Sequence, residues 1–407
     1  MDQNVLGFDQ AFALLMGHAA GVIAPECEEV DLLLSAGRIL GADVAADRDQ
    51  PPFDRSTRDG FTVRAEDLAS GRKLQVTGQV RAGDVWTGPP LAAGSAIEIM
   101  TGAPVPPGAD AVVMVEHVEE VAGVIHATAG LALRAGENIV PRGSEAHVGD
   151  VVLRKGTLIT AAEIALAAAC GRARLSAFRK PQVAVIATGD ELVELDQAPG
   201  PQQIRNSNSY ALAALVAAAG GTAVRMSIAR DHSEAVRASI AAGRGAGLLI
   251  LSGGVSMGKY DLVEEVLHSL GAEFFFTGVK MQPGRPVVFG RLPATGEFPP
   301  QFFFGLPGNP VSTEVTFHVF VEPMIRALCG AEAAGLRFVQ GTLAEDLPGK
   351  LGLTRLLPAR LTGVDVKLVG WQGSGDLAAN ARANCYALLP ADQEEFHNGE
   401  VIRILLR

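Results

Sequence analysis

The sequence predicts a multidomain α/β protein in which a doubly wound sheet is combined with a helical linker region and two β-rich regions. Three observations lead to this fold class. A length of 407 residues corresponds to two to four domains at roughly 100–200 residues each. Apolar strands alternate with helices over residues 181–330, as in a largely parallel sheet covered by helices. Short strand-like runs between Gly and Pro turns fill residues 47–147 and recur after residue 331.

The chain is expected to begin with a helix at residues 8–20, where apolar residues recur at helical spacing. A second helix is predicted at residues 31–40. After Pro51 and Pro52 we expect β structure and no helix until residues 160–169, where Thr160 is a suitable N-cap. The strand-like runs of this region are residues 74–77, 96–100, 111–115 and 124–127.

Residues 181–330 carry the alternating pattern of the doubly wound sheet. The expected strands are residues 183–187, 222–228, 248–251, 272–277, 287–289 and 302–306. The expected helices are residues 207–219, 233–242, 261–270 and 311–328. Further strands, predicted to form a small barrel or sandwich, are residues 353–361, 364–369, 387–390 and 401–406.

The charge balance argues against a nucleic-acid-binding protein. The chain has 34 Lys and Arg against 45 Asp and Glu, a formal net charge of −11, with no dense basic run. A small anionic ligand stays possible, because a few local arginines and backbone N–H groups are enough to bind one.

The cysteines and the apolar segments indicate a cytoplasmic protein without a membrane anchor. No basic region of a signal peptide opens the chain, and the uncharged run at 206–224 contains polar residues and a Gly-Gly pair. The four cysteines are far apart and include no C-x-x-C pair, so we expect reduced and mostly buried thiols. They are Cys27, Cys170, Cys329 and Cys385.

Polar and Gly-rich segments follow several predicted strands of the sheet, where open α/β sheets bind ligands. Glu191, Asp231 and Asp261 could hold a hard cation such as Mg²⁺ through carboxylate oxygens. Asp231 and Asp261 could instead be simple helix caps. A loop that begins Ser252-Gly253-Gly254 offers backbone N–H groups and hydroxyls to a phosphate. The four segments are Thr188-Gly189-Asp190-Glu191, Arg230-Asp231, Ser252–Gly258 with Asp261, and Pro307-Gly308-Asn309-Pro310.

Two longer patterned loops lie outside the sheet, at residues 51–61 and 99–110. They are rich in turn-forming residues and could be ordinary irregular loops, although function also concentrates in such segments. The sequence contains no G-x-x-x-x-G-K-[ST] and no G-x-G-x-x-G, which disfavours a P-loop kinase or a nicotinamide-dependent dehydrogenase.

These segments together identify a family. The chain resembles the MoeA-type molybdopterin molybdenumtransferases, bacterial relatives of the gephyrin E domain, over nearly its whole length. MTGAPVP and GLPGNPVS, some 200 residues apart and in this order, are the most specific of the matches. The matching segments are SAGRIL (35–40), PPFDRSTRDGF (51–61), MTGAPVPPGADAVV (100–113), ATGDEL (187–192), SGGVSMGKYD (252–261), QPGRP (282–286), GLPGNPVS (305–312), Gly373-Ser374 and Asn384.

The resemblance implies four domains and a homodimer. The first is an elongated helical linking domain of residues 1–46 and 148–180, into which a β-rich domain of residues 47–147 is inserted. Residues 181–330 then form a molybdopterin-binding α/β domain, and residues 331–407 a C-terminal β-barrel. The active site is implied to lie between the α/β domain of one subunit and the inserted domain of the other.

The resemblance also implies the reaction. Adenylylated molybdopterin and molybdate give molybdenum cofactor and AMP, with Mg²⁺ as cofactor. The implied catalytic residues are Asp59, Thr101, Glu191, Asp231 and Asp261. The implied Mg²⁺ ligands are Glu191, Asp231, Asp261 and Glu145. The residues assigned to substrate binding are Gly189, Asp190, Ser252, Gly253, Gly254, Ser256, Lys280, Arg285, Pro307, Gly308, Asn309, Pro310, Arg355 and Ser374.

The chain departs from the family pattern at a few cations. An expected arginine is Val140, and two expected lysines are Gly278 and Gln282. If residues 278–282 form one strand, Lys280 shares a face with both lost lysines, because strand side chains alternate. We therefore expect Lys280 and Arg285 to point into the anion pocket and to replace the lost charges.

Two alternatives stay open from the sequence. One is the preceding step, adenylyl transfer, performed by related MogA-type proteins that read T-G-G-T-G where this chain reads Ser252–Ser256. The other is a non-catalytic member that binds the cofactor or scaffolds another enzyme. The adenylyltransferase and molybdoenzyme-maturation proteins are candidate protein partners.

Overall fold

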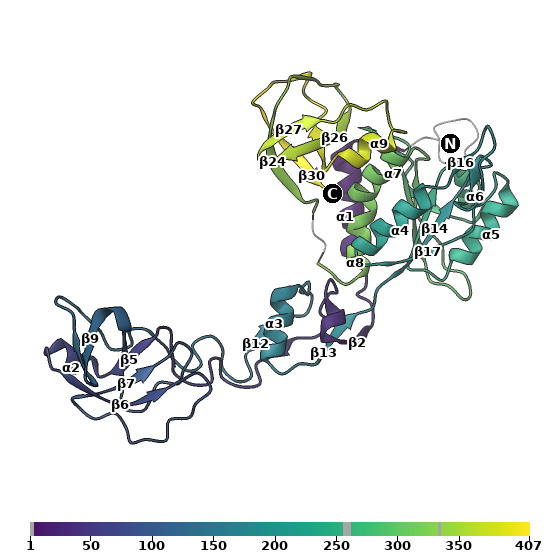
Figure 1. The fold of residues 1–407 in the computed structure, drawn as a ribbon. Helices are drawn as coiled ribbons and strands as arrows, with labels where there is room; N and C mark the ends of the chain where they lie inside the picture. Colours follow the sequence, from purple (N-terminus) through teal and green to yellow (C-terminus); the bar gives the residue numbers. More distant parts are fainter. Residues whose placement is uncertain (1–3, 255–261, 333–334) are drawn as a thin grey trace.

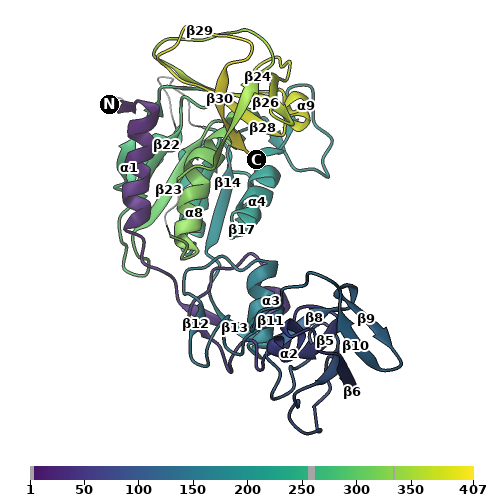
Figure 2. The ribbon, with the colours of Figure 1, turned by 90° about the vertical axis from the view of Figure 1, so that its left-hand side faces the viewer.

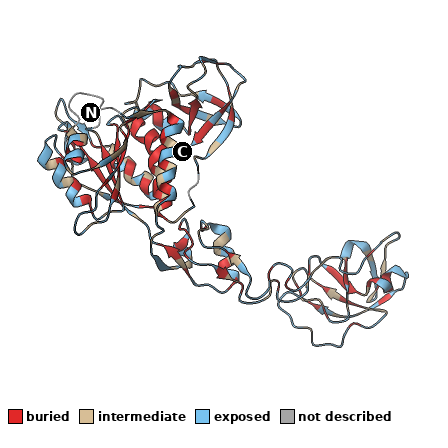
Figure 3. Cartoon of the chain, turned by 180° about the vertical axis from the view of Figure 1, so that it is seen from behind, coloured by how far each residue is buried: buried red, intermediate tan, exposed pale blue. Residues whose placement is uncertain are grey.

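A computed structural model describes residues 4–254, 262–332 and 335–407. The chain is elongated: a β-rich region at one end is joined through a narrow linking region to an α/β region and a barrel at the other end (Figures 1 and 2). Buried residues form separate clusters in the β-rich region, the linking region and the α/β and barrel regions (Figure 3). The β-rich region and the sheet of the α/β region therefore have independent cores.

The first helix, α1 (Phe8–Ala20), forms as predicted and packs on the α/β region. Its buried face consists of Phe8, Ala11, Leu15 and Ala19, which join the largest core cluster of the molecule. Strand β1 (Val5–Leu6) also pairs in parallel with β20 (Gly278–Val279). The N-terminal part of the predicted linking domain is thus anchored to the α/β region.

The helix predicted at residues 31–40 was wrong. The segment contains only a short 3₁₀ helix, η1 (Leu32–Ser35), after strand β2 (Cys27–Asp31). β2 pairs with β13 (Arg174–Phe178), so its backbone groups bond across strands instead of within a helix. Leu33 and Leu34 are 81% and 72% exposed, so no apolar helical face is buried here.

The linking region is small and is built from both flanks of the inserted segment. Strands β3 (Val44–Ala45) and β12 (Val151–Leu153) pair antiparallel, and α3 (Ala161–Ala169) packs beside them. Thr160 is the N-cap of α3, as predicted: its hydroxyl accepts from the Ala162 N–H, and the Thr160 N–H donates to Glu163. The cap fixes where α3 begins.

The β-rich region is a six-stranded sheet in the order β8-β5-β7-β6-β10-β9. The expectation that it contains no helix was wrong, because α2 (Ala65–Ala69) forms one turn beside the sheet. Five residues are too few for a helical period to show in the sequence. The strands are β5 (Gly60–Val63), β6 (Leu74–Val80), β7 (Ser95–Ile99), β8 (Ala111–Met114), β9 (Val118–Val121) and β10 (Val124–Ala127).

The α/β region is a six-stranded, doubly wound sheet in the order β17-β14-β18-β23-β22-β19. The first four strands are parallel, as predicted, whereas β22 runs antiparallel to both of its neighbours, β23 and the edge strand β19. The strands are β14 (Gln182–Ala187), β17 (Thr222–Arg225), β18 (Leu248–Ser252), β19 (Glu273–Phe276), β22 (Val288–Leu292) and β23 (Gln301–Leu306).

Helices cover both faces of this sheet. One face packs against α1, α4, α7 and α8, and the other against α5 and α6. The helix expected at 311–328 is one rod with a π-helical turn (Phe317–Val321) in its middle. The helices are α4 (Asn208–Ala218), α5 (Ser233–Gly243), α6 (Leu262–Ser269), α7 (Pro310–Thr316) and α8 (Glu322–Leu328).

The C-terminal region is a closed five-stranded barrel, which decides between the barrel and the sandwich. The strands pair in the order β26-β27-β24-β30-β28, and β28 pairs back with β26. Strand β21 (Met281–Gln282) of the α/β region adds in parallel to β26 and joins the two bodies. The barrel elements are β24 (Phe338–Leu343), β26 (Thr354–Thr362), β27 (Asp365–Leu368), β28 (Cys385–Leu389), β30 (Val401–Leu406) and the short helix α9 (Leu377–Arg382).

All four cysteines are free thiols; Cys27 is exposed and the other three are buried. Within the described residues, no helix has both the length and the apolar character that a membrane span requires.

Candidate functional site

A cavity of about 810 Å³ lies where β14, β18 and β23 end, which is where the sequence places its polar loops. Residues from three of the four predicted segments and Asp231 of the fourth line it. They are Gly189, Glu191, Asp231, Ser252, Gly253, Gly254, Pro307, Gly308, Asn309 and Pro310. We call this space the sheet cavity. Ser256 and Asp261 lie outside the described residues.

The Gly-rich loop of the sheet cavity requires its two glycines. Gly253 and Gly254 have φ angles of +92° and +66°, which other residues rarely adopt. A Cβ at Gly253 would lie 2.5 Å from the carbonyl oxygen of Thr188. The loop therefore lies close to the end of β14, with its main chain exposed to the cavity instead of a side chain.

We expect Gly253→Ala to lower kcat/KM at least about tenfold, because the φ angle and the close carbonyl force the loop to shift, at a strain of roughly 1–3 kcal/mol. Steady-state kinetics and a thermal melt would measure this. Gly296→Ala is the matched control, since no heavy atom lies within 4 Å of a Cβ added there. Equal kinetics for the two variants would contradict a role for the loop backbone.

Side-chain donors to which the sequence analysis gave no individual role also line the sheet cavity. The Thr188 hydroxyl and the Asn206 side-chain nitrogen are buried and have no hydrogen-bond partner among the described residues. Asn208 donates to Ser252 Oγ at 3.0 Å and to the Gly308 carbonyl at 2.8 Å, and so joins the ends of β18 and β23. Buried polar atoms without partners are uncommon and indicate a ligand or water that completes them.

Asp231 is not a helix cap, so that interpretation was wrong. The N-cap of α5 is His232, whose Nδ1 accepts from the Ala235 N–H at 3.2 Å. Asp231 and Asp190 instead exchange hydrogen bonds, each carboxylate accepting from the other residue's N–H at 3.3 and 3.2 Å. This pair connects the loops after β14 and β17 and places the Asp231 carboxylate at the cavity.

Glu191 lies beside the main chain of its own loop. A Cβ added to Gly189 would lie 2.5 Å from the Glu191 carboxylate, so a side chain at Gly189 would displace it. Within the described residues, no salt bridge engages Glu191 or Asp231, and no group of three or more His, Cys, Asp or Glu is arranged to hold a metal. Two lining carboxylates suit Mg²⁺, which usually takes one or two carboxylates together with substrate phosphates.

A second cavity, of about 480 Å³, adjoins the first between the α/β region and the barrel. We call it the barrel cavity. Both cavities are lined by Pro286, Pro307 and Asn309. The lining of the barrel cavity includes Arg285 and Lys350 but, among the described residues, no acidic one. Among the described residues, the sheet side of the combined space therefore carries Glu191, Asp231 and Arg205, whereas the charged residues on the barrel side are cations.

The barrel itself supplies part of this lining. Ser374 lines the barrel cavity, and its hydroxyl accepts from the Asn309 side chain at 2.9 Å. Lys350 and Trp371, which the sequence analysis did not select, line it as well. Arg355 pairs with Gln282 in the β26–β21 ladder and donates to the Pro348 carbonyl at 2.7 Å. Burial lowers the pKa of Arg355, and its Nε is buried without a partner among the described residues.

The single strand expected through residues 278–282 was wrong. β20 ends at Val279 and β21 begins at Met281, and Lys280 lies at the bend between them. The main chain turns there because the Lys280 N–H donates to Leu6 while its carbonyl accepts from Thr354 in the barrel. Lys280 is exposed and lines neither cavity, whereas Arg285 lines the barrel cavity.

Asp59 and Thr101 meet in the β-rich region. The Thr101 N–H donates to Asp59 Oδ1 at 2.6 Å, and bonds from the N–H and hydroxyl of Thr101 lower the pKa of Asp59. Glu145 also belongs to this region and forms a salt bridge with Arg55 at 2.8 Å. The β-rich sheet lies at the far end of the chain from the α/β sheet (Figures 1 and 2). One chain therefore does not bring these three residues to Glu191 and Asp231.

Comparisons with known proteins agree with the order of regions along the chain. Residues 6–171 match the MoeA N-terminal region (domain I and II), residues 184–327 a probable molybdopterin binding domain, and residues 340–406 the MoeA C-terminal region (domain IV). The molybdopterin molybdenumtransferase of Staphylococcus epidermidis is 35% identical over 387 residues, which cover 93% of this chain and 90% of the relative. The chain belongs to the MoeA family of molybdopterin molybdenumtransferases. The Nostoc relative of the same name is also 35% identical, over 93% of this chain and 88% of its own.

Solved structures give the same result. The molybdopterin biosynthesis MoeA protein from Pyrococcus horikoshii superimposes with a TM-score of 0.75 at 30% identity and 99% coverage of both chains. The MoeA architecture is thus confirmed along the chain, and with it an enzyme of molybdenum cofactor biosynthesis. The names of the relatives favour molybdenum transfer over the adenylyltransferase and scaffold alternatives.

Proposed function

We propose that this MoeA-family enzyme inserts molybdate into adenylylated molybdopterin in an Mg²⁺-dependent reaction that releases AMP. One observation carries the proposal: the sheet cavity, with its carboxylates and exposed main chain, opens beside a cavity whose charged residues, in the described part of the chain, are the cations Arg285 and Lys350. All the ligands in this reaction are anions, so electrostatic positioning is the main requirement of the site.

The sheet cavity is assigned to the phosphates and the ribose of the adenylyl group. The main chain at Gly253 and Gly254 and the unpartnered donors of Thr188 and Asn206 are suited to anionic or hydroxyl oxygens. Ser252 and the Pro307–Pro310 turn complete the same wall, and Gly189 and Asp190 hold the loop that carries Glu191. Ser256 and Asp261 keep their assigned roles as part of this proposal.

Glu191 and Asp231 are the proposed Mg²⁺ ligands of the chain, with Asp261 as a third candidate. When bound, the ion would neutralise charge on the phosphates and so favour departure of AMP. Asp190 contributes indirectly, because its carboxylate holds the Asp231 main chain in place.

The barrel cavity is assigned to molybdate and the pterin end of the substrate. Arg285, Lys350 and the Ser374 hydroxyl line it, and a tetrahedral dianion needs such donors and cations. Arg355 lies beside it in the strand pair with Gln282. We assign to Lys350 the compensating charge that the sequence analysis gave to Lys280.

The proposal includes a cytoplasmic homodimer. Asp59, Thr101 and Glu145 are separated from the two cavities within one chain, so a second subunit has to supply them. The low pKa of Asp59 keeps its carboxylate charged at pH values where an ordinary aspartate begins to protonate.

An AMP-release assay tests the proposed reaction. Purified protein, adenylylated molybdopterin, molybdate and Mg²⁺ should give AMP in proportion to cofactor formed, and omission of Mg²⁺ or molybdate should abolish it. Pyrophosphate release from ATP and molybdopterin would identify an adenylyltransferase instead. No turnover in either assay, with retained pterin binding, would identify a non-catalytic member.

Lys350→Met is expected to raise the KM for molybdate or for the adenylylated pterin about 10- to 100-fold, because a charge-assisted hydrogen bond contributes roughly 1.5–3 kcal/mol. Lys280→Met is the matched control and should leave both constants within about twofold, as an exposed lysine outside the cavities contributes little. A larger effect at Lys280 than at Lys350 would reverse this assignment.

A further inference from the structure

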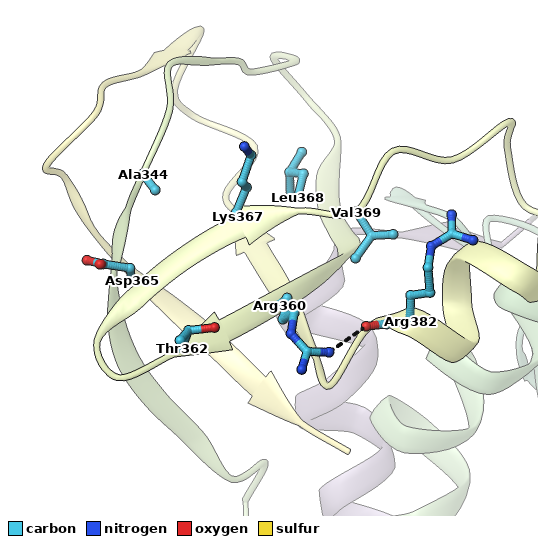
Figure 4. Close-up of a pocket in the computed structure, with 8 residues that line it drawn as sticks. All are labelled: Ala344, Arg360, Thr362, Asp365, Lys367, Leu368, Val369 and Arg382. Carbon is cyan, nitrogen blue, oxygen red and sulfur yellow. Dashed lines mark hydrogen bonds between the residues drawn. The ribbon is translucent and has the colours of Figure 1, made fainter.

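A third cavity, of about 540 Å³, lies on the surface of the C-terminal barrel, and none of its described lining residues belongs to the sheet or barrel cavity. Figure 4 shows its side chains. Three of them are cations from three elements: Arg360 on β26, Lys367 on β27 and Arg382 on α9. We call this cavity the cationic pocket.

In the described part of the chain, the three cations of the cationic pocket form no salt bridge. Arg360 and Lys367 are directly opposite one another in the β26–β27 ladder, an unfavourable like-charge pair. Arg360 and Arg382 donate to main-chain carbonyls, of Arg382 and Gly370, both at 3.3 Å. Among the described residues, no salt bridge engages any of the three cations, in a chain with 45 acidic and 34 basic residues. The missing counter-charge is therefore expected from a bound partner.

Nearby acidic groups do not remove this imbalance. Asp365 is the acidic member of the lining and lies opposite Thr362, not opposite a cation. The carboxylate of Glu345 accepts from the Leu368 N–H at 3.1 Å and is thereby engaged with the main chain. The three cations therefore outnumber the two nearby carboxylates, and neither carboxylate forms a salt bridge with a cation of the pocket.

The arrangement of the cations points to the class of partner. Their charged ends are spread around the pocket, with Leu368 and Val369 between Lys367 and Arg382 (Figure 4). Separated charges around apolar side chains suit a peptide chain that carries several carboxylates. They suit a single compact anion less well. A nucleic acid would extend beyond the pocket over a protein of net charge −11, which repels it. We propose that the cationic pocket binds an acidic segment of another protein.

Helix α9 places this docking site beside the candidate active site. Arg382, at the C-terminal end of α9, lines the cationic pocket, and Leu377, at its N-terminal end, lines the sheet cavity. Asp376 caps the helix by accepting from the Ala379 N–H at 2.9 Å. A docked protein would lie one short helix away from the proposed substrate.

Selection from a random library of short peptides displayed on phage tests the proposal with the full chain. Peptides that bind should be enriched in Asp and Glu, with at least two in each. Their affinity should fall about tenfold or more for the double variant Arg360→Glu/Lys367→Glu and should weaken with salt. Lys73→Glu, an exposed lysine of the β-rich region, is the matched control and should bind as the wild type does.

Several results would overturn the proposal. Selected peptides without acidic enrichment, or equal binding by the wild type and the double variant, would contradict it. Tighter binding of a single-stranded oligonucleotide at the same residues would assign the pocket to nucleic acid. Conversion of a dimer to monomers by the double variant would make it an interface between copies of this chain. If the Glu variant does not fold, as judged by circular dichroism, Arg360→Gln/Lys367→Gln takes its place.

Discussion

Replacement of Asp231 by Asn is expected to lower kcat/KM for AMP release about 100-fold or more, a typical loss when one electrostatic contact to the reacting group is removed. Asn keeps the size of the side chain and an oxygen that can accept from the Asp190 N–H, so the loop contact at 3.3 Å can persist. What disappears is the negative charge at the sheet cavity. Since His232, not Asp231, caps α5, helix stability does not depend on this carboxylate.

The measurement is steady-state kinetics over a range of Mg²⁺ concentrations, together with a thermal melt. The melting temperature should stay within about 2 °C of the wild type. Glu234→Gln, which removes an exposed charge from the first turn of the same helix, is the control and should keep full activity. A near-normal rate for Asp231→Asn at limiting Mg²⁺ would remove Asp231 from the proposed metal site.

A mixture of two inactive variants, Asp59→Asn and Glu191→Gln, is expected to recover activity. If the site combines the β-rich region of one subunit with the α/β region of the other, each mixed dimer contains one intact site. Random exchange of equal amounts then gives roughly one quarter of the wild-type activity, because half of the dimers are mixed and each has one intact site of two.

Each variant alone should be nearly inactive, and the recovered activity should appear only after subunit exchange, for example after mild denaturation and refolding together. Glu191→Gln mixed with Asp231→Asn is the matched control: both changes lie in the sheet cavity of the α/β region, so each site of a mixed dimer carries one of them and this mixture should recover no activity. A double variant carrying Asp59→Asn and Glu191→Gln in one chain, mixed with wild type, should likewise leave no intact site in mixed dimers. If the wild type sediments as a monomer under the conditions in which it is active, the shared-site proposal is wrong.

The sequence was sufficient to predict the elements whose own residues show an apolar pattern or a capping residue. α1 and α3 have regular apolar spacing or a capping residue, and both form as predicted. The buried strands β14, β18 and β23 are continuous apolar runs, typical of a parallel sheet covered on both faces. The polar loops after them gather at one edge because parallel strands end together, so much of the sheet cavity was predictable from order alone.

Where prediction failed, a distant partner decided the structure. The helix predicted at residues 31–40 does not form, because strand β2 pairs with β13 at the start of that segment. The main chain bends at Lys280 because its N–H and carbonyl bond to Leu6 and Thr354. Neither pairing is visible locally, since the partners lie more than 70 residues away in the sequence. Short elements such as α2 and α9 have too few residues to show a period.

By itself, then, the sequence determined the family, the doubly wound sheet and the residues that follow its strands, because motifs and apolar periodicity are properties of contiguous residues. Only the tertiary structure decided that the barrel closes, that Lys350 and not Lys280 lines the barrel cavity, and that Asp59 lies in a different body from Glu191. Those facts depend on contacts between segments far apart in the chain. Such contacts form only when the whole chain buries its apolar surface together.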